Sequence, residues 1–187
     1  QNRRYKQLED NQSLWRELEA FVDAIHQSLD VRQTAFAIVN DGRRIVRCDR
    51  LTLAVSYGGR CRVEAVSGLD SIDRRAGEAQ SLAKLAEAVL RTGEPLWWNG
   101  AKRELPPQIA QPLDAHIDRS HARLVAVLPL IAGKSRTFET AEHAAGETDR
   151  PLGALIVEQF SSAQADEALE QRAKIAAQHS ARALASA

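Results

Sequence analysis

A glycine pair between two alternating runs constrains the fold of this chain more than any other feature. Residues 51–57 alternate between apolar and small or polar side chains, Gly58 and Gly59 follow, and residues 60–67 resume the strand chemistry. Adjacent glycines supply the positive φ angles that a tight hairpin turn requires. The sequence therefore predicts a β-hairpin in the first third of the chain.

Two later runs predict the centre of the same sheet. Residues 124–131 and 152–160 are rich in valine, leucine and isoleucine, and both are too short to be helices of this character. The polar stretch Gly133 to Arg150 between them is expected to be an exposed hairpin loop. Pro95 to Trp98 is short and apolar, which favours an edge strand.

Apolar residues at helical spacing predict five helices around these strands. The second helix is expected to start at Asp30, whose carboxylate is a good N-cap, and the third to end at Gly93. The fourth is expected to be interrupted at Pro112, which has no N–H to donate. The expected segments are 8–29, 30–47, 81–90, 105–120 and 164–187.

Composition bounds the function. A length of 187 residues favours one domain, and 25 basic against 25 acidic side chains give no net charge to attract nucleic acid. Cys48 and Cys61 have neither disulfide-framework nor zinc spacing, which favours a reducing, cytoplasmic compartment. Because the chain has no methionine and begins at Gln1 within a helical pattern, we expect it to be part of a longer protein. That parent is expected to carry other domains and to be either soluble or membrane-attached.

Three stretches resemble GAF domains. They are GRRIVRCDRLTLAV at residues 42–55, SHARLVAVLPLI at 120–131 and PLGALIVE at 151–158, and the order of expected helices and strands is also that of the family. The resemblance covers residues 20–182, with residues 1–29 and 164–187 as flanking signalling and dimerisation helices of a single domain. Residues 59–68 and 105–130 also resemble the bacterial GAF modules that precede membrane-fusion-type efflux adaptor regions.

The resemblance implies an α/β (α+β) fold with a central antiparallel sheet of five to six strands. It also implies helices on both sides of the sheet, with the long N- and C-terminal helices packed on one face. On the other face, loops and short helices would roof a small-molecule pocket. GAF domains usually regulate another part of their protein, so the resemblance implies a non-catalytic sensor.

The expected pocket lies between the sheet and residues 97–121, where aromatic and polar side chains converge. Its ligand is unknown. The family's bilin-binding members attach the chromophore through a cysteine beside a histidine, but Ser120 precedes His121 here, so no covalent bilin is expected. The cyclic-nucleotide pattern of the family is not matched by residues 138–143. The candidate ligand-binding residues are Trp97, Trp98, Asp114, His116 and His121, with Arg62 from the hairpin.

Two cysteines keep an enzymatic alternative open. Free methionine sulfoxide reductases are GAF enzymes with thiolate nucleophiles, so Cys48 or Cys61 would have to be accessible and have a lowered pKa. Neither cysteine lies in that family's pattern, and both fit better as small buried residues. The five histidines are scattered and no metal site is expected. We therefore expect no catalytic residues.

The terminal helices carry more apolar surface than one sheet face needs, which favours a parallel homodimer. The residues predicted for the dimer interface are Leu14, Leu18, Phe21, Ile25, Leu169, Ala173 and Ala176. The leading hypothesis is a sensor that binds a small molecule or partner and signals through these helices. The alternative to it, besides the thiol enzyme, is a ligand-free dimerisation scaffold of a membrane-associated protein.

Overall fold

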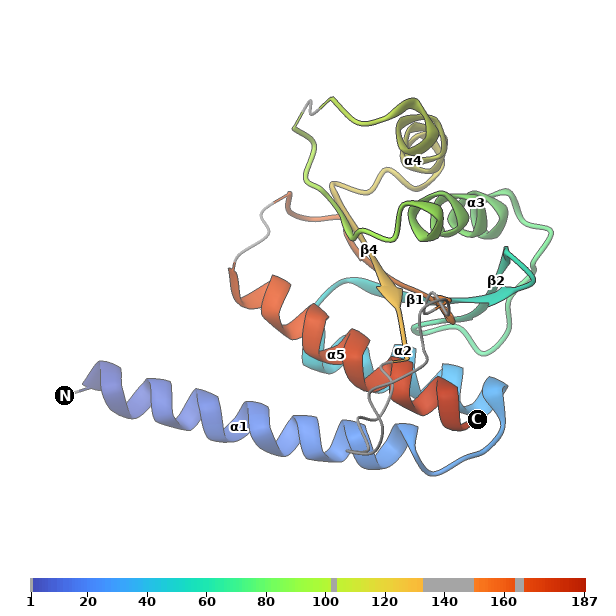
Figure 1. The fold of residues 1–187 in the computed structure, drawn as a ribbon. Helices are drawn as coiled ribbons and strands as arrows, with labels where there is room; N and C mark the ends of the chain where they lie inside the picture. The colour runs from blue at the N-terminus through green and yellow to red at the C-terminus, as the bar shows by residue number, and fades with distance from the viewer. Residues whose placement is uncertain (1, 102–103, 133–149, 164–166) are drawn as a thin grey trace, which may run out of the picture.

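The structure, a computed structural model, describes residues 2–101, 104–132, 150–163 and 167–187. The expected loop at 133–150 and the segment compared with the cyclic-nucleotide pattern lie almost wholly outside these residues. A five-stranded antiparallel sheet in the order β2-β1-β5-β4-β3 forms the centre of the fold (Figure 1). Its strands are β1 (Arg50–Tyr57), β2 (Arg60–Val66), β3 (Leu96–Trp98), β4 (Leu124–Leu130) and β5 (Gly153–Gln159).

Helices cover both faces of the sheet, and each face has its own apolar core. One core joins three helices to the sheet, and the other lies under the remaining two. The first face carries α1 (Asn2–Ile25), α2 (Val31–Val46) and α5 (Glu167–Ser186), and the second carries α3 (Gly77–Thr92) and α4 (Pro107–Ser120). The predicted fold class is confirmed, with terminal helices α1 and α5 on one face.

The hairpin forms as the glycine pair predicts. Gly58 and Gly59 have φ angles of 59° and 86°, which only glycine adopts without strain. The pairing of β1 with β2 shifts register between Leu53 and Ala54, and Glu64 is the extra residue of the resulting β-bulge. The bulge turns the side chain of Glu64 off the regular alternation of β2.

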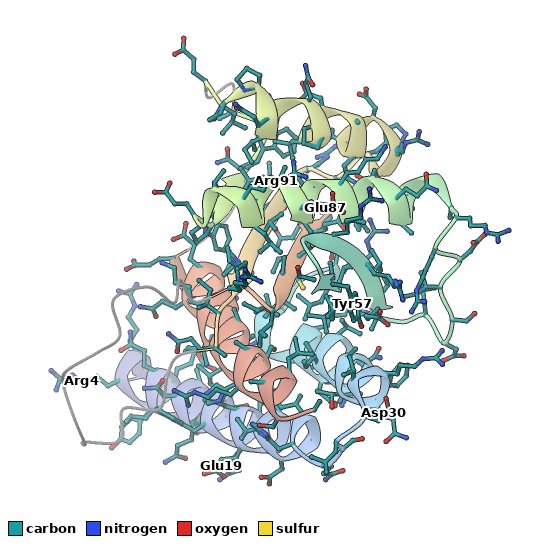
Figure 2. The ribbon with its side chains drawn as sticks, turned by 45° about the vertical axis from the view of Figure 1, so that its right-hand side comes forward. Arg4, Glu19, Asp30, Tyr57, Glu87 and Arg91 are labelled. Atoms are coloured by element: carbon teal, nitrogen blue, oxygen red, sulfur yellow. The ribbon has the colours of Figure 1, made fainter. Side chains whose placement is uncertain are left out.

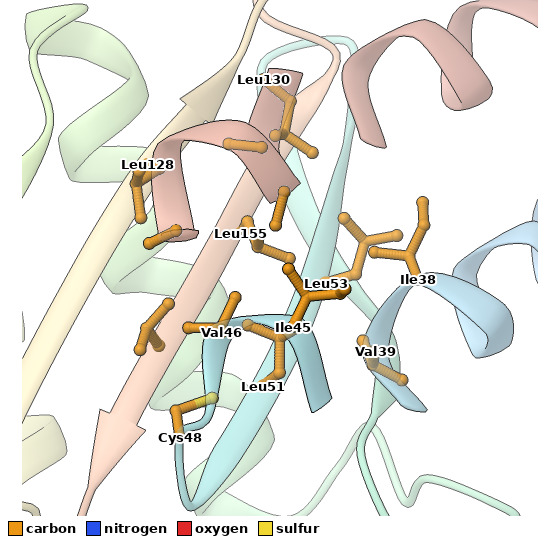
Figure 3. Packing of buried hydrophobic residues seen from close by; sticks show 14 of the residues in the cluster. Ile38, Val39, Ile45, Val46, Cys48, Leu51, Leu53, Leu128, Leu130 and Leu155 are labelled. Atoms are coloured by element: carbon orange, nitrogen blue, oxygen red, sulfur yellow. The ribbon is translucent and has the colours of Figure 1, made fainter. Parts of the chain in front are cut away.

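The two apolar runs become β4 and β5, which lie inside the sheet and are almost wholly buried. Alternate side chains of β5 serve the two cores: Leu155 meets the helices of the first face, and Ile156 those of the second. Figure 3 shows Leu155 beside Leu53 of β1, with Ile38 of α2 facing them. β3 is an edge strand, as its short apolar stretch predicts.

Local chemistry sets the limits of α2. The Asp30 carboxylate accepts a hydrogen bond from the backbone N–H of Arg32 at 2.9 Å, which caps the helix as expected. Arg47 ends it in the left-handed conformation, with φ of 58°.

The expected interruption of α4 at Pro112 is wrong, because the helix runs unbroken from Pro107 to Ser120. Buried Ile109 and Leu113 anchor α4 on both sides of the proline and offset its missing hydrogen bond.

The positions of the terminal helices in the structure require a correction to the predicted dimer interface. Phe21, Ile25, Leu169, Ala173 and Ala176 are all buried within a single copy of the chain, where they pack on its own sheet. A second copy cannot contact side chains that are already buried. Leu14 and Leu18, which complete the predicted set, are half-buried.

None of the helices in the described part of the chain combines the length and the apolar character that spanning a membrane requires.

Candidate functional site

The space under α3 and α4 is the expected place for a ligand, and the chain fills it with its own side chains. Leucine, isoleucine and valine side chains from both helices meet those of the sheet there, including Leu85, Leu113 and Ile156. Polar groups enter this apolar layer at one end of the sheet, where β1 begins and β5 ends. These polar groups form one connected cluster.

His116 and Glu158 are at the centre of this cluster, and both are fully buried. His116 of α4 places Nε2 2.6 Å from Oε1 of Glu158 on β5. Its other ring nitrogen, Nδ1, lies 2.8 Å from the hydroxyl of Ser81 on α3. The Ser81 hydroxyl in turn donates to the carbonyl oxygen of Glu78 at 2.8 Å. One chain of hydrogen bonds thus connects both roof helices to the sheet.

Arg50 extends the cluster across the sheet. It lies opposite Glu158 in the β1–β5 register, and its Nε donates to Oε2 of Glu158 at 2.6 Å. Its Nη2 lies 2.6 Å from Oε1 of Glu78, close enough for an ion pair although the geometry is not that of a hydrogen bond. The guanidinium also stacks over the ring of Phe160, 4.9 Å from its centroid. The cluster is defined by Arg50, Glu78, Ser81, His116 and Glu158, and we call it the buried polar network.

Hydrogen bonds and burial together set the charge of Glu158 in the buried polar network. The Ser81 hydroxyl donates to the Glu78 carbonyl and lies within hydrogen-bond distance of His116 Nδ1. Burial alone would raise the pKa of Glu158, but the hydrogen bonds from His116 and Arg50 outweigh it and hold that pKa below its ordinary value. Glu158 is therefore a carboxylate, and His116 Nε2 donates to it. Arg50 supplies the permanent positive charge beside this buried carboxylate.

Ser81, His116 and Glu158 are connected in the order of a catalytic triad, but the geometry does not support hydrolysis. In a hydrolase the serine donates its proton to the histidine, whereas Ser81 donates to a main-chain carbonyl. All three residues are buried, so a substrate cannot reach the hydroxyl. The network is a structural tie between the roof and the sheet.

The six predicted ligand residues do not form one site. Trp97 and Trp98 are neighbours on β3 and face opposite sides of the sheet, where Trp97 packs on the first core and Trp98 on the second. Asp114 and His121 are exposed on and beyond α4, and His121 ends that helix in the left-handed conformation. Only His116 joins Trp98 under the roof.

Arg62, the sixth candidate, is exposed on the hairpin and stacks on Tyr57, with its guanidinium 5.0 Å from the ring centroid. Four residues of the buried polar network were not predicted from the sequence: Arg50, Glu78, Ser81 and Glu158. A charged residue inside the apolar run of β5 was the available signal for Glu158, because a buried carboxylate requires a partner.

Neither cysteine has the properties of a nucleophile. Burial raises the pKa of the Cys48 thiol to about 12. Burial, and then the nearby Glu87 carboxylate, raise the pKa of the Cys61 thiol to about 11. Both thiols are protonated at neutral pH, whereas thiol catalysis requires the thiolate. Within the described residues, no group of three or more His, Cys, Asp or Glu side chains is placed to hold a metal ion.

Two cavities open at the surface near β2. The larger, of about 570 Å³, lies between α2 and the segment 69–75, with Arg32, Phe36 and Arg74 in its walls. The smaller, of about 250 Å³, lies between β2 and α3. Both are outside the predicted site between the sheet and residues 97–121.

Three large apolar side chains of α1, between its first turn and just past its midpoint, are exposed. Tyr5, Leu8 and Trp15 are 66%, 59% and 62% exposed. Leu8, Trp15 and half-buried Val22 follow one another at intervals of seven residues, which places them on one line along the helix. This part of α1 extends beyond the sheet and α5 (Figure 1). We call Tyr5, Leu8 and Trp15 the exposed stripe of α1.

Comparison with solved structures identifies the fold. The GAF domain of an Acinetobacter phosphoenolpyruvate-protein phosphotransferase aligns with a TM-score of 0.62, 16% identity and coverage of 92% of this chain and 93% of that chain. The GAF domain of the cyanobacteriochrome TePixJ aligns with a TM-score of 0.57 and 17% identity over 86% and 92% of the two chains. Residues 122 to 287 of a methyl-accepting chemotaxis protein align with a TM-score of 0.61 and 10% identity over 88% and 94%.

These likenesses show that the chain has the fold of GAF domains, and at such identities they extend to the fold alone. No protein-family model matches the sequence, and no curated protein matches it.

Proposed function

We propose that this chain, which has the GAF fold, is a non-catalytic regulatory domain of a larger protein, paired with a second copy through α1. Structures with the same fold come from proteins named as a cyanobacteriochrome, a chemotaxis protein and a sensor histidine kinase, which supports a role in signalling. The protonated, buried cysteines support a non-catalytic role. Its ligand, if the domain senses one, and its cytoplasmic location remain predictions, as does the resemblance to efflux adaptor modules.

The exposed stripe of α1 is the observation that carries this proposal. α1 has 24 residues, and its core contacts are made by residues of its C-terminal half, such as Phe21 and Ile25. A polar helix would suffice for the N-terminal half if it only extended into water. Instead, large apolar side chains lie there at heptad spacing, the pattern by which helices pair.

A second copy is the partner that the pattern favours. Leu8 and Trp15 lie on one line along the helix, so in a parallel pair each meets its equivalent and both copies bury the same stripe. The interface would continue from the stripe to Val22, which packs against the first core and is only half-buried in a single copy. A change in the tilt of α1 in one copy would then be felt by the other.

A ligand-free scaffold is the second candidate, and one observation favours it. The space under α3 and α4, where the fold would offer a pocket, is occupied by apolar side chains and the buried polar network. Pairing through α1 serves a scaffold as well as a sensor. Binding of a ligand elsewhere on the domain would distinguish the sensor from the scaffold, because only the sensor requires a ligand.

The test is the mass of the chain in solution. Light scattering of the full chain is expected to give a dimer, and the double variant Leu8→Glu with Trp15→Glu is expected to give a monomer. The matched control places glutamates at Ser13 and Ala20, which are also exposed and seven residues apart but lie on another side of α1. Circular dichroism checks that both variants keep their helices.

The control variant is expected to remain a dimer, with a cost limited to about 0.2–0.5 kcal/mol for each new like-charge pair along the helix. A monomeric wild-type chain would refute pairing through α1. Equal dissociation of the control and the stripe variant would refute the assignment of the interface to Leu8 and Trp15.

A further inference from the structure

The smaller cavity is lined in part by small side chains, and it has a high concentration of positive charge. It lies between the outer strand of the sheet, β2, and the side of α3 that faces it. Ala79 and Ala83, one turn apart on α3, leave space opposite Cys61 and Val63 of β2. In Figure 2, Glu87 marks the position on α3 above β2 where this wall of the cavity ends.

Four cations line this cavity together with one carboxylate. Arg60, Arg62, Arg74 and Lys84 are the cations, and Glu87 is the carboxylate. Glu64 lies 2.8 Å from Arg74 and neutralises one further cation, which leaves an excess of two positive charges. The chain as a whole has no net charge, so this excess is a local feature. Four cations brought around a volume of about 250 Å³ repel one another, and an anion in the cavity would relieve that repulsion.

The one carboxylate is already engaged. Oε1 of Glu87 accepts a hydrogen bond from the backbone N–H of Cys61 at 2.9 Å, and Oε2 lies 3.8 Å from Nη2 of Arg91. The first contact covers a backbone donor on the open edge of β2, and the second supplies Glu87 with a cation from outside the cavity. Glu87 therefore does not neutralise the cations that line it.

Two of the guanidinium groups are held in place by the protein. Arg74 has Nη2 2.8 Å from Oε2 of Glu64, and its Nε donates to the carbonyl oxygen of Val63 at 3.4 Å. Arg62 is stacked over the ring of Tyr57. Side chains that are ordered before binding lose less conformational entropy when a ligand arrives, which favours affinity.

We propose that this cavity binds a small phosphate-bearing molecule with at least two negative charges. Guanidinium groups present several N–H donors in a fixed fork that matches phosphate oxygens, and Lys84 adds a flexible cation. The volume is below the roughly 300–1,000 Å³ of drug-sized ligand sites, which limits the ligand to a small one. The inference is independent of pairing through α1, and it supplies a ligand class that pairing alone does not.

Isothermal titration calorimetry with inorganic pyrophosphate tests the proposal. The wild-type chain is expected to bind the probe, with an affinity that falls as sodium chloride is raised. The double variant Arg60→Ala with Lys84→Ala is expected to bind at least about tenfold more weakly, because it removes two cations that donate charge-assisted hydrogen bonds to phosphate oxygens. Both side chains are exposed, so the variant is expected to fold.

The matched control removes one arginine and one lysine from the other face of the molecule, Arg44→Ala with Lys174→Ala, and both of these side chains are also exposed. It is expected to bind pyrophosphate as the wild type does. No binding to the wild type, or equal weakening by the two double variants, would overturn the proposal. A lipid headgroup shares this chemistry. The vesicle test uses phosphatidylcholine vesicles that contain phosphatidic acid. If the chain sediments with these vesicles but does not bind pyrophosphate, the proposal of a small soluble ligand is also overturned.

Discussion

Replacing Glu158 with glutamine measures what the buried polar network contributes to stability. Glutamine has nearly the size and shape of glutamate, so the packing of β5 is kept and only the charge is lost. Arg50 and His116 each lie 2.6 Å from a carboxylate oxygen of Glu158, and Glu158 is fully buried. The substitution therefore leaves the Arg50 guanidinium and the His116 ring beside a neutral amide.

The magnitude follows from burial. Removing one partner of a buried ion pair costs about 3–5 kcal/mol, because the remaining charge keeps its desolvation penalty. A domain of this size has a free energy of unfolding of roughly 5–15 kcal/mol, so Glu158→Gln is expected to remove a large fraction of it. At about 2–4 °C for each kcal/mol, the melting temperature falls by about 6–20 °C.

Urea unfolding followed by circular dichroism gives the free energy directly. The matched control is Glu94→Gln, at an exposed position after α3, which is expected to change stability by less than about 0.5 kcal/mol. A loss below about 1 kcal/mol for Glu158→Gln would refute the charge assignment of the network. The double variant His116→Leu with Glu158→Leu is expected to lose less than the single one, since Arg50 keeps Glu78 and no unpaired histidine remains.

Three further outcomes are expected. Because the folded-state pKa of Glu158 is lowered, its stabilisation is complete above the ordinary glutamate pKa of about 4.3 and is lost as the pH falls through the folded value, so the stability gap between wild type and Glu158→Gln should narrow in acid urea titrations. Alkylation followed by mass spectrometry should modify half-buried Cys61 faster than buried Cys48, and both rates should rise with pH well above 8. Gly153→Ala should destabilise the chain more than Gly42→Ala in thermal unfolding, because a Cβ at 153 would strike the β1 backbone, whereas one at 42 meets a leucine side chain that can move.

Local chemistry in the sequence was sufficient to predict most elements of the fold. The Asp30 cap, the Gly58–Gly59 turn and the two apolar runs each act within a few residues of the chain, so their effect is visible without tertiary structure. The antiparallel sheet and the assignment of helices to faces came from the resemblance to a known family, and the strand order was not predicted. The predicted interruption at Pro112 was wrong because the packing of α4 outweighs the local cost of the proline.

The candidate site depends on contacts between distant residues, and for that reason it was not predicted. Arg50 and Glu158 are separated by 108 positions and meet only through the β1–β5 register. The pocket prediction grouped Trp97 with Trp98, although neighbouring strand residues point to opposite faces whatever the fold. The sequence pattern of α1 could not show that Phe21 faces the core of its own chain while Trp15 faces water.

The helices on the two faces of the sheet are held by different kinds of contact. α4 is tied to the sheet by the buried side chain of His116 and α3 by a partly exposed ion pair between Glu78 and Arg50, whereas α1 is held by apolar contacts of its C-terminal half. The basic cavity borders β2, and the turn after β2 is joined to α2 by a hydrogen bond from Gly68 N–H to Asn40 Oδ1 at 3.0 Å. α2 packs directly on α1. The basic cavity is therefore connected to the exposed stripe through a continuous series of contacts from β2 to α2 and from α2 to α1.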